Sequence, residues 1–169
     1  YTIFKNMKNT TKLFQYLFEG IEDYSLDAGY VFRGVPKPVA VSYAKGKYVP
    51  TSLNEQMPFD PVVVEMMLGE DYSEMSQEDV DYQIQSVCPW YDGSAKSVKG
   101  GVNTTSDLDR AIDYAGDNGY VLVLELVSDN FCDFDNSYIY VKSVNDIKLK
   151  AIYEVETGKE YTPSEFLGK

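Results

Sequence analysis

The stretch Tyr120-Val121-Leu122-Val123-Leu124-Glu125-Leu126-Val127 is an almost unbroken apolar run. Gly119 and Ser128 bound it, and both residue types favour turns. A short apolar run that is closed by turn formers is typical of a strand buried on both faces. The sequence therefore predicts that residues 120–127 form the central strand of a sheet.

Further strands are expected on both sides of this run. Downstream, residues 137–142 alternate in part between apolar and polar side chains, and residues 147–155 follow the Asn145-Asp146 turn. Upstream, Gly29-Tyr30-Val31-Phe32-Arg33-Gly34 is β-branched and aromatic with glycine at both ends. This pattern predicts a strand with Arg33 at its exit.

Helices are expected mainly before residue 120. Capping residues and the spacing of apolar positions predict helices at residues 11–24, from Asp60-Pro61, from Ser76 to about Val87, and through Leu108, Ala111, Ile112 and Ala115 with Ser106 as the N-cap. Loop and edge strand rather than helix are predicted around Pro36, Pro38, Gly46 and Pro50, and a loop over residues 90–101. Because strands in series follow the helices, we expect an α+β fold with a mixed or mainly antiparallel sheet.

Length and composition narrow the class of protein. A chain of 169 residues predicts one domain, residues 1–169, with a hydrophobic core of its own. Its 15 basic and 27 acidic residues give a net charge of −12, so we expect no long-range attraction to nucleic acid or anionic lipid. The absence of histidine excludes mechanisms that need an imidazole. No apolar stretch approaches 18 residues, so we expect a soluble protein without a membrane partner.

The two cysteines, Cys88 and Cys132, permit one disulfide at most. Cys88 follows a predicted helix and Cys132 precedes a predicted strand, and a chain of this size needs no covalent staple. We therefore expect two free thiols. The chain opens on Tyr1 rather than Met, so we expect a processed product or part of a longer chain.

Two motifs and a strand follow one another in an order that is known from one family. They are Phe32-Arg33-Gly34-Val35, then Thr104-Thr105-Ser106-Asp107 with Ala111, Tyr114 and Ala115 behind it, then the strand from Val121 to Leu126. This order resembles the ADP-ribosyltransferase fold, in particular its phage and bacterial arginine-directed branch. That branch has an aromatic-Arg-Gly strand as its first motif and Ser-Thr-Ser as its second. The resemblance spans about residues 30–127 and extends more weakly to residue 155.

The resemblance implies a fold, a cofactor and a function. In the family the arginine grips NAD, the hydroxyl motif shapes the pocket and a glutamate supplies catalysis. The implied fold is an α+β, ADP-ribosyltransferase-like arrangement of mainly antiparallel sheets with flanking helices. The implied function is that of an NAD-binding mono-ADP-ribosyltransferase that acts on a protein or nucleic-acid acceptor, in the cytoplasm or after delivery into a host cell. The implied NAD-binding residues are Arg33, Gly34, Thr104, Thr105, Ser106 and Tyr114, and the candidate catalytic residues are Arg33, Ser106, Asp135 and Tyr138.

The chemistry of NAD cleavage assigns roles to these residues independently of the family resemblance. Cleavage of the nicotinamide–ribose bond passes through an oxocarbenium-like sugar, so a site needs a cation for the diphosphate, hydrogen bonds to the ribose and a carboxylate that faces the developing charge. Arg33 would be the cation. An extended backbone up to Ser106 would put the Thr104 and Ser106 hydroxyls on one side. Tyr114 would stack on nicotinamide.

The third motif departs from the family pattern. The family has Glu-x-Glu or Gln-x-Glu at the start of the corresponding strand, where this chain has Asn136-Ser137-Tyr138. On that register Tyr138 holds the position of the catalytic glutamate, and a shifted register would offer Asp135. A catalytically silent relative is therefore the alternative function, namely a binding or inhibitory module whose acidic surface meets a basic partner.

Structural roles remain open for the same residues, and other sites find less support. Arg33 would serve equally in a surface ion pair, residues 104–106 as a helix cap, and Tyr114 in a core. Asp129, Asp133, Asp135 and Asn136 offer clustered oxygen ligands, and residues 133–137 begin like a calcium-binding EF-hand loop. Tyr138 and Val144 replace the glycine and the glutamate of that loop, so we expect a solvated acidic turn and no metal. No spacing selects a glycosidase pair of carboxylates, and Gly100-Gly101 lacks the continuation of a phosphate loop.

Overall fold

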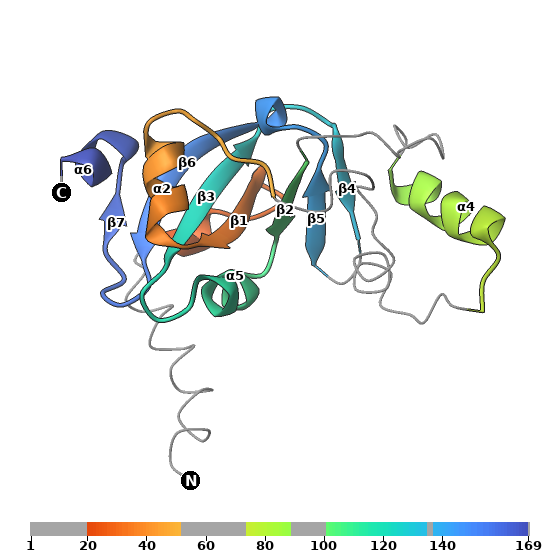
Figure 1. Cartoon of the computed structure of the whole chain (residues 1–169), viewed down its shortest axis with the longest axis horizontal. Helices are drawn as coiled ribbons and strands as arrows, with labels where there is room; N and C mark the ends of the chain where they lie inside the picture. Colours follow the sequence, from red (N-terminus) through yellow and green to blue (C-terminus); the bar gives the residue numbers. More distant parts are fainter. Residues whose placement is uncertain (1–19, 52–73, 89–100, 135–136, 169) are drawn as a thin grey trace, which may run out of the picture. The chain divides into compact units, whose positions relative to one another are not determined.

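The computed structural model describes residues 20–51, 74–88, 101–134 and 137–168 (Figure 1). In these ranges the elements are, in chain order, η1 (Ile21–Asp23), β1 (Tyr30–Val35), α2 (Lys37–Ala44), α4 (Gln77–Val87), β2 (Val102–Thr105), α5 (Leu108–Ala115), β3 (Tyr120–Leu126), β4 (Phe131–Asp133), β5 (Tyr138–Val141), η3 (Val144–Asp146), β6 (Ile147–Glu154), β7 (Glu160–Tyr161) and α6 (Pro163–Leu167).

The strands form one seven-stranded sheet in the order β4-β5-β2-β1-β3-β6-β7. The pairs β1–β2, β1–β3, β4–β5 and β6–β7 are antiparallel. The longest ladder joins β1 to β3 and runs from Tyr30 opposite Glu125 to Val35 opposite Tyr120. The predicted α+β class, with an antiparallel sheet and flanking helices, is confirmed.

The chain divides into two compact units. Unit 1 comprises Tyr1–Tyr48, Thr105–Leu126 and Lys148–Lys169, and unit 2 comprises Val49–Thr104 and Val127–Ile147. Strand β2 contributes Val102–Thr104 to unit 2 and Thr105 to unit 1. Each unit is therefore assembled from segments that are far apart in the sequence.

The core of unit 1 is built on β3, as its apolar run predicts. Val121 to Leu124 are fully buried, and alternate residues face opposite sides of the sheet. One face carries a cluster that includes Phe32 of β1 and Ala111 of α5. Its buried members are Ile21, Phe32, Ala111, Val121, Val123, Ala151, Tyr153 and Val155. The predicted central strand is thus confirmed, with its end at Leu126.

The segment around Pro36 and Pro38 is a helix, so the loop and edge strand predicted there are wrong. Pro36 is the N-cap of α2 and Pro38 lies in its first turn. Proline is compatible with the first helical turn, because backbone N–H groups there have no partner inside the helix. Ala40 and Tyr43 are the buried residues of α2, and the helix packs against α6 and β3.

Helix α5 begins one residue later than the predicted cap. Asp107, and not Ser106, is the N-cap, and its carboxylate accepts a hydrogen bond of 2.9 Å from the Asp109 N–H. The Thr105 hydroxyl oxygen in turn accepts from the Asp107 N–H at 3.0 Å. Sequence spacing cannot distinguish these neighbours, because serine and aspartate are equally good caps.

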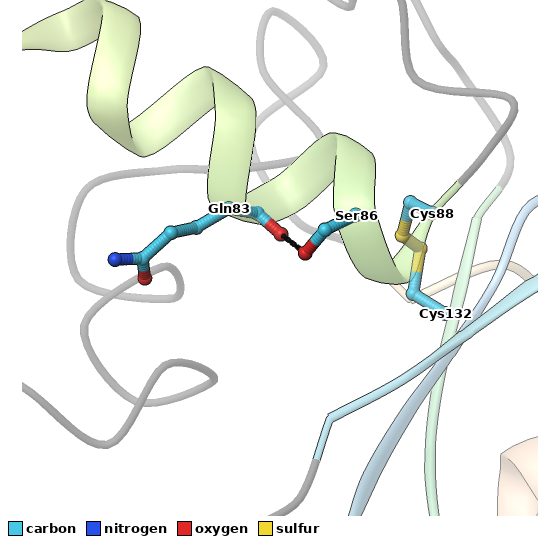
Figure 2. The surroundings of a disulfide bond; sticks show 4 residues. All are labelled: Gln83, Ser86, Cys88 and Cys132. Carbon is cyan, nitrogen blue, oxygen red and sulfur yellow. Dashed lines mark hydrogen bonds between the residues drawn. A yellow bond between two sulfur atoms is a disulfide. The ribbon is translucent and has the colours of Figure 1, made fainter.

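Unit 2 contains α4, which was predicted correctly from Ser76 to Val87. The Ser76 side chain accepts from the Asp79 N–H, as expected of an N-cap. Val80, Ile84 and Cys88 are buried at a spacing of four residues, so they mark the inner face of the helix. Figure 2 shows that the last of them is joined by a disulfide to Cys132 on β4.

The expected free thiols are therefore wrong. The Cα atoms of Cys88 and Cys132 lie 4.7 Å apart, within the range of a disulfide, across a sequence separation of 44 residues. Both residues are fully buried. The prediction considered only whether a chain of this size requires a disulfide for stability. A disulfide forms because the end of α4 packs next to β4 in the folded protein.

The remaining predicted elements have mixed outcomes. The strands at residues 137–142 and 147–155 are confirmed as β5 and β6. The strand at residues 29–34 is confirmed as β1, but it continues to Val35, so Arg33 lies inside it and not at its exit. Most of the helix predicted at residues 11–24, the helix from Asp60-Pro61 and the loop at residues 90–100 lie outside the described residues, and residues 21–23 form a 3₁₀ turn. The short strands β4 and β7 were not predicted, and neither was α6, although Thr162 and Glu165 form a capping box with Pro163 at the first helical position.

Candidate functional site

The first two motifs meet in unit 1. Phe32 on β1 is the direct partner of Thr105 on β2, although more than seventy residues separate them. Residues that pair directly point to the same face of a sheet, so Phe32 and Thr105 both face α5. Arg33 follows Phe32 in the strand, and its side chain therefore leaves β1 on the other face.

Arg33 contacts Tyr43 of α2 on that face. Its Nη1 donates a hydrogen bond of 2.5 Å to the Tyr43 hydroxyl, and its Cζ lies 5.4 Å from the centre of the Tyr43 ring. The Arg33 side chain is half-buried, whereas Tyr43 is 1% exposed. The arginine thus reaches from the central part of the sheet to a buried phenol.

Tyr43 belongs to a short series of aromatic contacts. Its ring stacks on that of Tyr48, with centres 4.8 Å apart and an interplanar angle of 14°. The Tyr48 hydroxyl oxygen accepts a hydrogen bond of 2.8 Å from the Leu149 N–H of β6. Burial raises the pKa of Tyr43, and the neighbouring Arg33 opposes this shift only in part. Tyr43 is therefore a neutral phenol across the physiological pH range.

The packing of α5 against β1 explains why Arg33 is followed by glycine, a residue without a side chain. A Cβ at Gly34 would collide with the Ala111 carbonyl oxygen and lie 2.6 Å from the Ala115 nitrogen. Helix α5 therefore rests directly on the β1 backbone, and its Tyr114 lies on the α5 side of the sheet with a 60% exposed side chain. Arg33 and Tyr114, predicted to share a binding site, stand on opposite faces of β1.

The two threonines of the hydroxyl motif are engaged inside the protein. In unit 1 the Thr105 hydroxyl oxygen receives the Asp107 N–H. In unit 2 the Thr104 hydroxyl donates to the Ile139 carbonyl oxygen at 2.8 Å. Both threonines are buried, whereas Ser106, the first residue after β2, is half-buried. Ser106 is thus more exposed than the two threonines of the motif.

The third motif lies at the start of β5 in unit 2. Tyr138 is half-buried, and its carbonyl oxygen accepts from the Phe134 N–H at 3.0 Å. Ser137 before it has a φ of 68°, a left-handed conformation that non-glycine residues rarely adopt. Asp135, the alternative catalytic acid, and Asn136 lie outside the described residues.

Two aromatic residues of this region, Tyr43 and Tyr48, were missed by sequence reasoning. The prolines of their segment predict loop and edge strand, and neither tyrosine belongs to one of the sequence motifs. A signal was present: Ala40 and Tyr43 have the three-residue spacing of a helix face directly after a proline-rich N-terminus.

Neither a metal-ligating cluster nor a membrane-spanning helix occurs among the described residues. Among those residues no group of three or more Cys, Asp or Glu side chains could hold a metal ion. No helix in the same ranges is long and apolar enough to cross a membrane. Comparison of the chain with protein-family models, curated proteins and solved structures gives no match.

Proposed function

We propose that this chain binds NAD through unit 1, with Arg33 as the side chain that pairs with the diphosphate. The pairing of Phe32 with Thr105 carries the proposal, because it brings the aromatic-Arg-Gly motif against the hydroxyl motif, as a shared nucleotide site requires. The sequence of either motif alone does not predict this pairing of strands.

A local cation is a physical requirement for such a ligand. The net charge of −12 repels a diphosphate at long range, so binding depends on a positive group at short range. A guanidinium suits this task, since its planar donors match two phosphate oxygens at once. Half-burial of Arg33 strengthens such a contact, because the surrounding dielectric is lower than in water.

The other motif residues differ in how they relate to the proposed NAD site. Ser106 is the hydroxyl best suited to a ribose. Gly34, Thr104 and Thr105 support the strands through close packing and internal hydrogen bonds. Tyr114 fits the proposed NAD site poorly, because α5 holds it on the face opposite Arg33. Nicotinamide stacking on Tyr114 is therefore not part of the proposal.

Binding with slow turnover is the activity that these residues favour. NAD supplies a glycosidic bond whose cleavage leaves a cationic ribose, and a nearby carboxylate is what stabilises that charge. Tyr138, at the family's glutamate position, is a phenol and cannot supply it. We therefore propose a binding module of ADP-ribosyltransferase type first, and a transferase that modifies a protein or nucleic acid, with Asp135 as its acid, second.

Isothermal titration of NAD tests the binding proposal. The wild type should bind, and Arg33→Ala should weaken binding at least tenfold, because a charge-assisted contact to the diphosphate is lost. Arg110→Ala is the matched control. Arg110 lies on α5 and pairs loosely with Asp107 at 3.9 Å, so its removal changes the net charge equally without touching Arg33. Equal affinities of wild type and Arg33→Ala would refute the proposed site.

Nicotinamide release separates the two candidate functions. Loss of one electrostatic stabiliser costs a few kcal/mol, so turnover by the wild type should be roughly hundreds-fold slower than that of Tyr138→Glu. Asp135→Asn should abolish the residual rate if Asp135 supplies the charge. Brisk turnover that survives Asp135→Asn would show that another residue is the catalytic acid.

A further inference from the structure

We infer that unit 1 carries a lysine patch, formed by Lys45, Lys47, Lys148 and Lys150, that binds the phosphate backbone of a nucleic acid. The inference goes beyond the proposed NAD site and is independent of it. None of the four lysines belongs to the sequence motifs of that site, and the closing experiment uses no NAD.

The four lysines come from two segments that meet in the fold of unit 1. Lys45 is the C-cap of α2, and Lys47 stands two residues later. The next residue, Tyr48, accepts a hydrogen bond of 2.8 Å from the Leu149 N–H of β6. The other two lysines are the residues on either side of Leu149. This contact therefore brings the end of α2 beside the part of β6 that carries the second pair of lysines.

The alternation of side chains in β6 places this pair on the same face of the sheet as α2. Ala151 belongs to the core cluster that includes Ala111 of α5, so it faces α5. Side chains alternate along a strand, so Lys148 and Lys150 project from the opposite face. Arg33 contacts α2 on that face. Both lysines of β6 are exposed, whereas the residues between and beside them are buried.

The surroundings of the patch are poor in negative charge. Residues 28–48, which include α2 and its C-terminal end, contain no Asp or Glu, although the chain has 27 acidic residues. In the part of the chain that the structure describes, no ion pair joins any of the four lysines to a carboxylate. All four are exposed. The patch is thus a local concentration of positive charge on an acidic protein.

The acidic residues of α5 lie on the other side of the sheet. Asp109 and Asp113 belong to this helix, which packs on the face opposite α2. A helix with its side chains is about 10 Å thick, which exceeds the Debye length of about 8 Å at physiological ionic strength. Charges on the outer side of α5 are therefore largely screened at the patch. The net charge of −12 opposes the approach of a polyanion, but the lysines govern the contact at short range.

The composition of the patch favours a nucleic acid over a protein or a lipid surface. Protein interfaces have an apolar centre and are depleted in lysine, whereas interfaces with nucleic acid are polar and positively charged. Among the described residues of unit 1, the exposed large hydrophobic side chains are Tyr114 on α5 and Leu167 on α6. Neither α2 nor β6 thus offers the apolar anchor that a protein partner or membrane insertion requires. Lysine, a compact point charge, suits phosphate groups.

The contact is expected to involve the nucleic-acid backbone rather than the bases. Tyr48, the aromatic residue beside the patch, is half-buried and already stacks on Tyr43. Recognition of bases needs exposed aromatic rings or bidentate hydrogen-bonding groups in a groove. A patch of lysines alone supplies neither, so binding should be independent of sequence and sensitive to salt.

Fluorescence anisotropy of a labelled duplex DNA tests the inference with the full chain. Two duplexes of unrelated sequence should bind with equal affinity. The logarithm of the association constant should fall with the logarithm of the salt concentration with a slope of about −3.6, which is about −0.9 for each of four lysines at a phosphate. Absence of DNA binding at low salt would overturn the inference.

Matched double variants show whether the patch is the binding surface. Lys148→Gln/Lys150→Gln should weaken binding by about tenfold or more and make the salt slope shallower by about 2, and neutralisation of the two lysines at the end of α2 should do the same. Arg110→Gln/Lys159→Gln is the control, because it also removes two positive charges, from α5 and from the β6–β7 turn. An equal loss in the control would show that net charge governs binding and would overturn the inference.

Two further probes separate the other anionic partners. Polyglutamate and vesicles that contain phosphatidylserine should both bind more weakly than DNA. Tighter binding of either probe, lost in Lys148→Gln/Lys150→Gln, would assign the patch to an acidic protein segment or to a lipid surface and would overturn the inference. The substituted lysines are exposed, so the variants should fold like the wild type, as circular dichroism verifies.

Discussion

Units 1 and 2 are stabilised by different means. The three longest strands of unit 1, β1, β3 and β6, have six to eight residues and bury a continuous apolar core. In unit 2, β4 and β5 have three and four residues, and the two cysteines of the chain form a disulfide between the end of α4 and β4. Short strands bury less apolar surface per element, so a covalent link contributes relatively more there.

This difference teaches where each unit is vulnerable. Unit 1 depends on close approach of backbone and side chains, so added volume should harm it most. Unit 2 depends on a constraint that acts largely through the unfolded chain, so removal of the bridge should harm it most. Four experiments probe the contrast, beginning with the largest expected effect.

Removal of the disulfide should have the largest effect. For a closed loop of 44 residues, chain entropy predicts a loss of about 4 kcal/mol in the free energy of unfolding. Urea unfolding of Cys88→Ala/Cys132→Ala measures it, and a reductant present throughout unfolding and refolding should affect the wild type but not the variant. Hydrogen exchange should accelerate in α4, β4 and β5. An equal acceleration in β1 and β3 would contradict the contrast between the units.

Gly34→Ala should be the most damaging single change in unit 1. The new Cβ would collide with backbone atoms of α5, which cannot rotate away as a side chain can, so we expect a loss of about 3 kcal/mol in urea unfolding. Gly168→Ala is the matched control, because the nearest atoms to its Cβ lie 3.7 Å away and its φ is −81°. Similar losses in both variants would show that α5 yields easily.

Alkaline pH should weaken unit 2 through Tyr140. Burial raises the pKa of Tyr140 from 10.0 to about 12. The folded state therefore favours the neutral phenol. The contribution of Tyr140 to the free energy of unfolding is complete below pH 10 and declines between pH 10 and 12, by up to about 3 kcal/mol. Urea unfolding over this range should show a shallower decline for Tyr140→Phe than for wild type. Tyr82→Phe, at an exposed tyrosine of the same unit, should decline like wild type.

The two helix caps offer the smallest and most local comparison. Asp107→Ala in unit 1 and Ser76→Ala in unit 2 each remove a side-chain acceptor for a helix N–H and should each cost about 1 kcal/mol. Hydrogen exchange should then accelerate in α5 for the first variant and in α4 for the second. Exchange that rises in both helices for either variant would mean that the units open together.

The sheet was largely predictable from local pattern, because strand signals are local. The run at residues 120–127 and the glycine-bounded segment at 29–34 bury side chains on both faces of the sheet. Burial on both faces requires mostly apolar residues, which the composition of each segment shows directly. Helix α2 was missed because prolines were weighed as breakers without regard to their position in the first turn. The local sequence signal for α2 was therefore present but was interpreted wrongly.

The candidate site was less predictable, because its residues act through distant partners. The motifs singled out Arg33, but no spacing indicates that Tyr43 accepts its hydrogen bond or that Thr104 donates to Ile139. The side on which Tyr114 lies depends on how α5 docks on Gly34. Such relations depend on the packing of elements, which single-residue preferences do not encode.

Apolar runs, glycines and capping residues in this chain were enough to predict an α+β protein with its central strand at β3, since periodicity and turn chemistry act within a few residues. Strand order, the approach of Cys88 to Cys132 and the face from which Arg33 projects required the folded chain. Each of these arises where segments many residues apart come within bonding distance, and that distance is set by the packing of the whole unit.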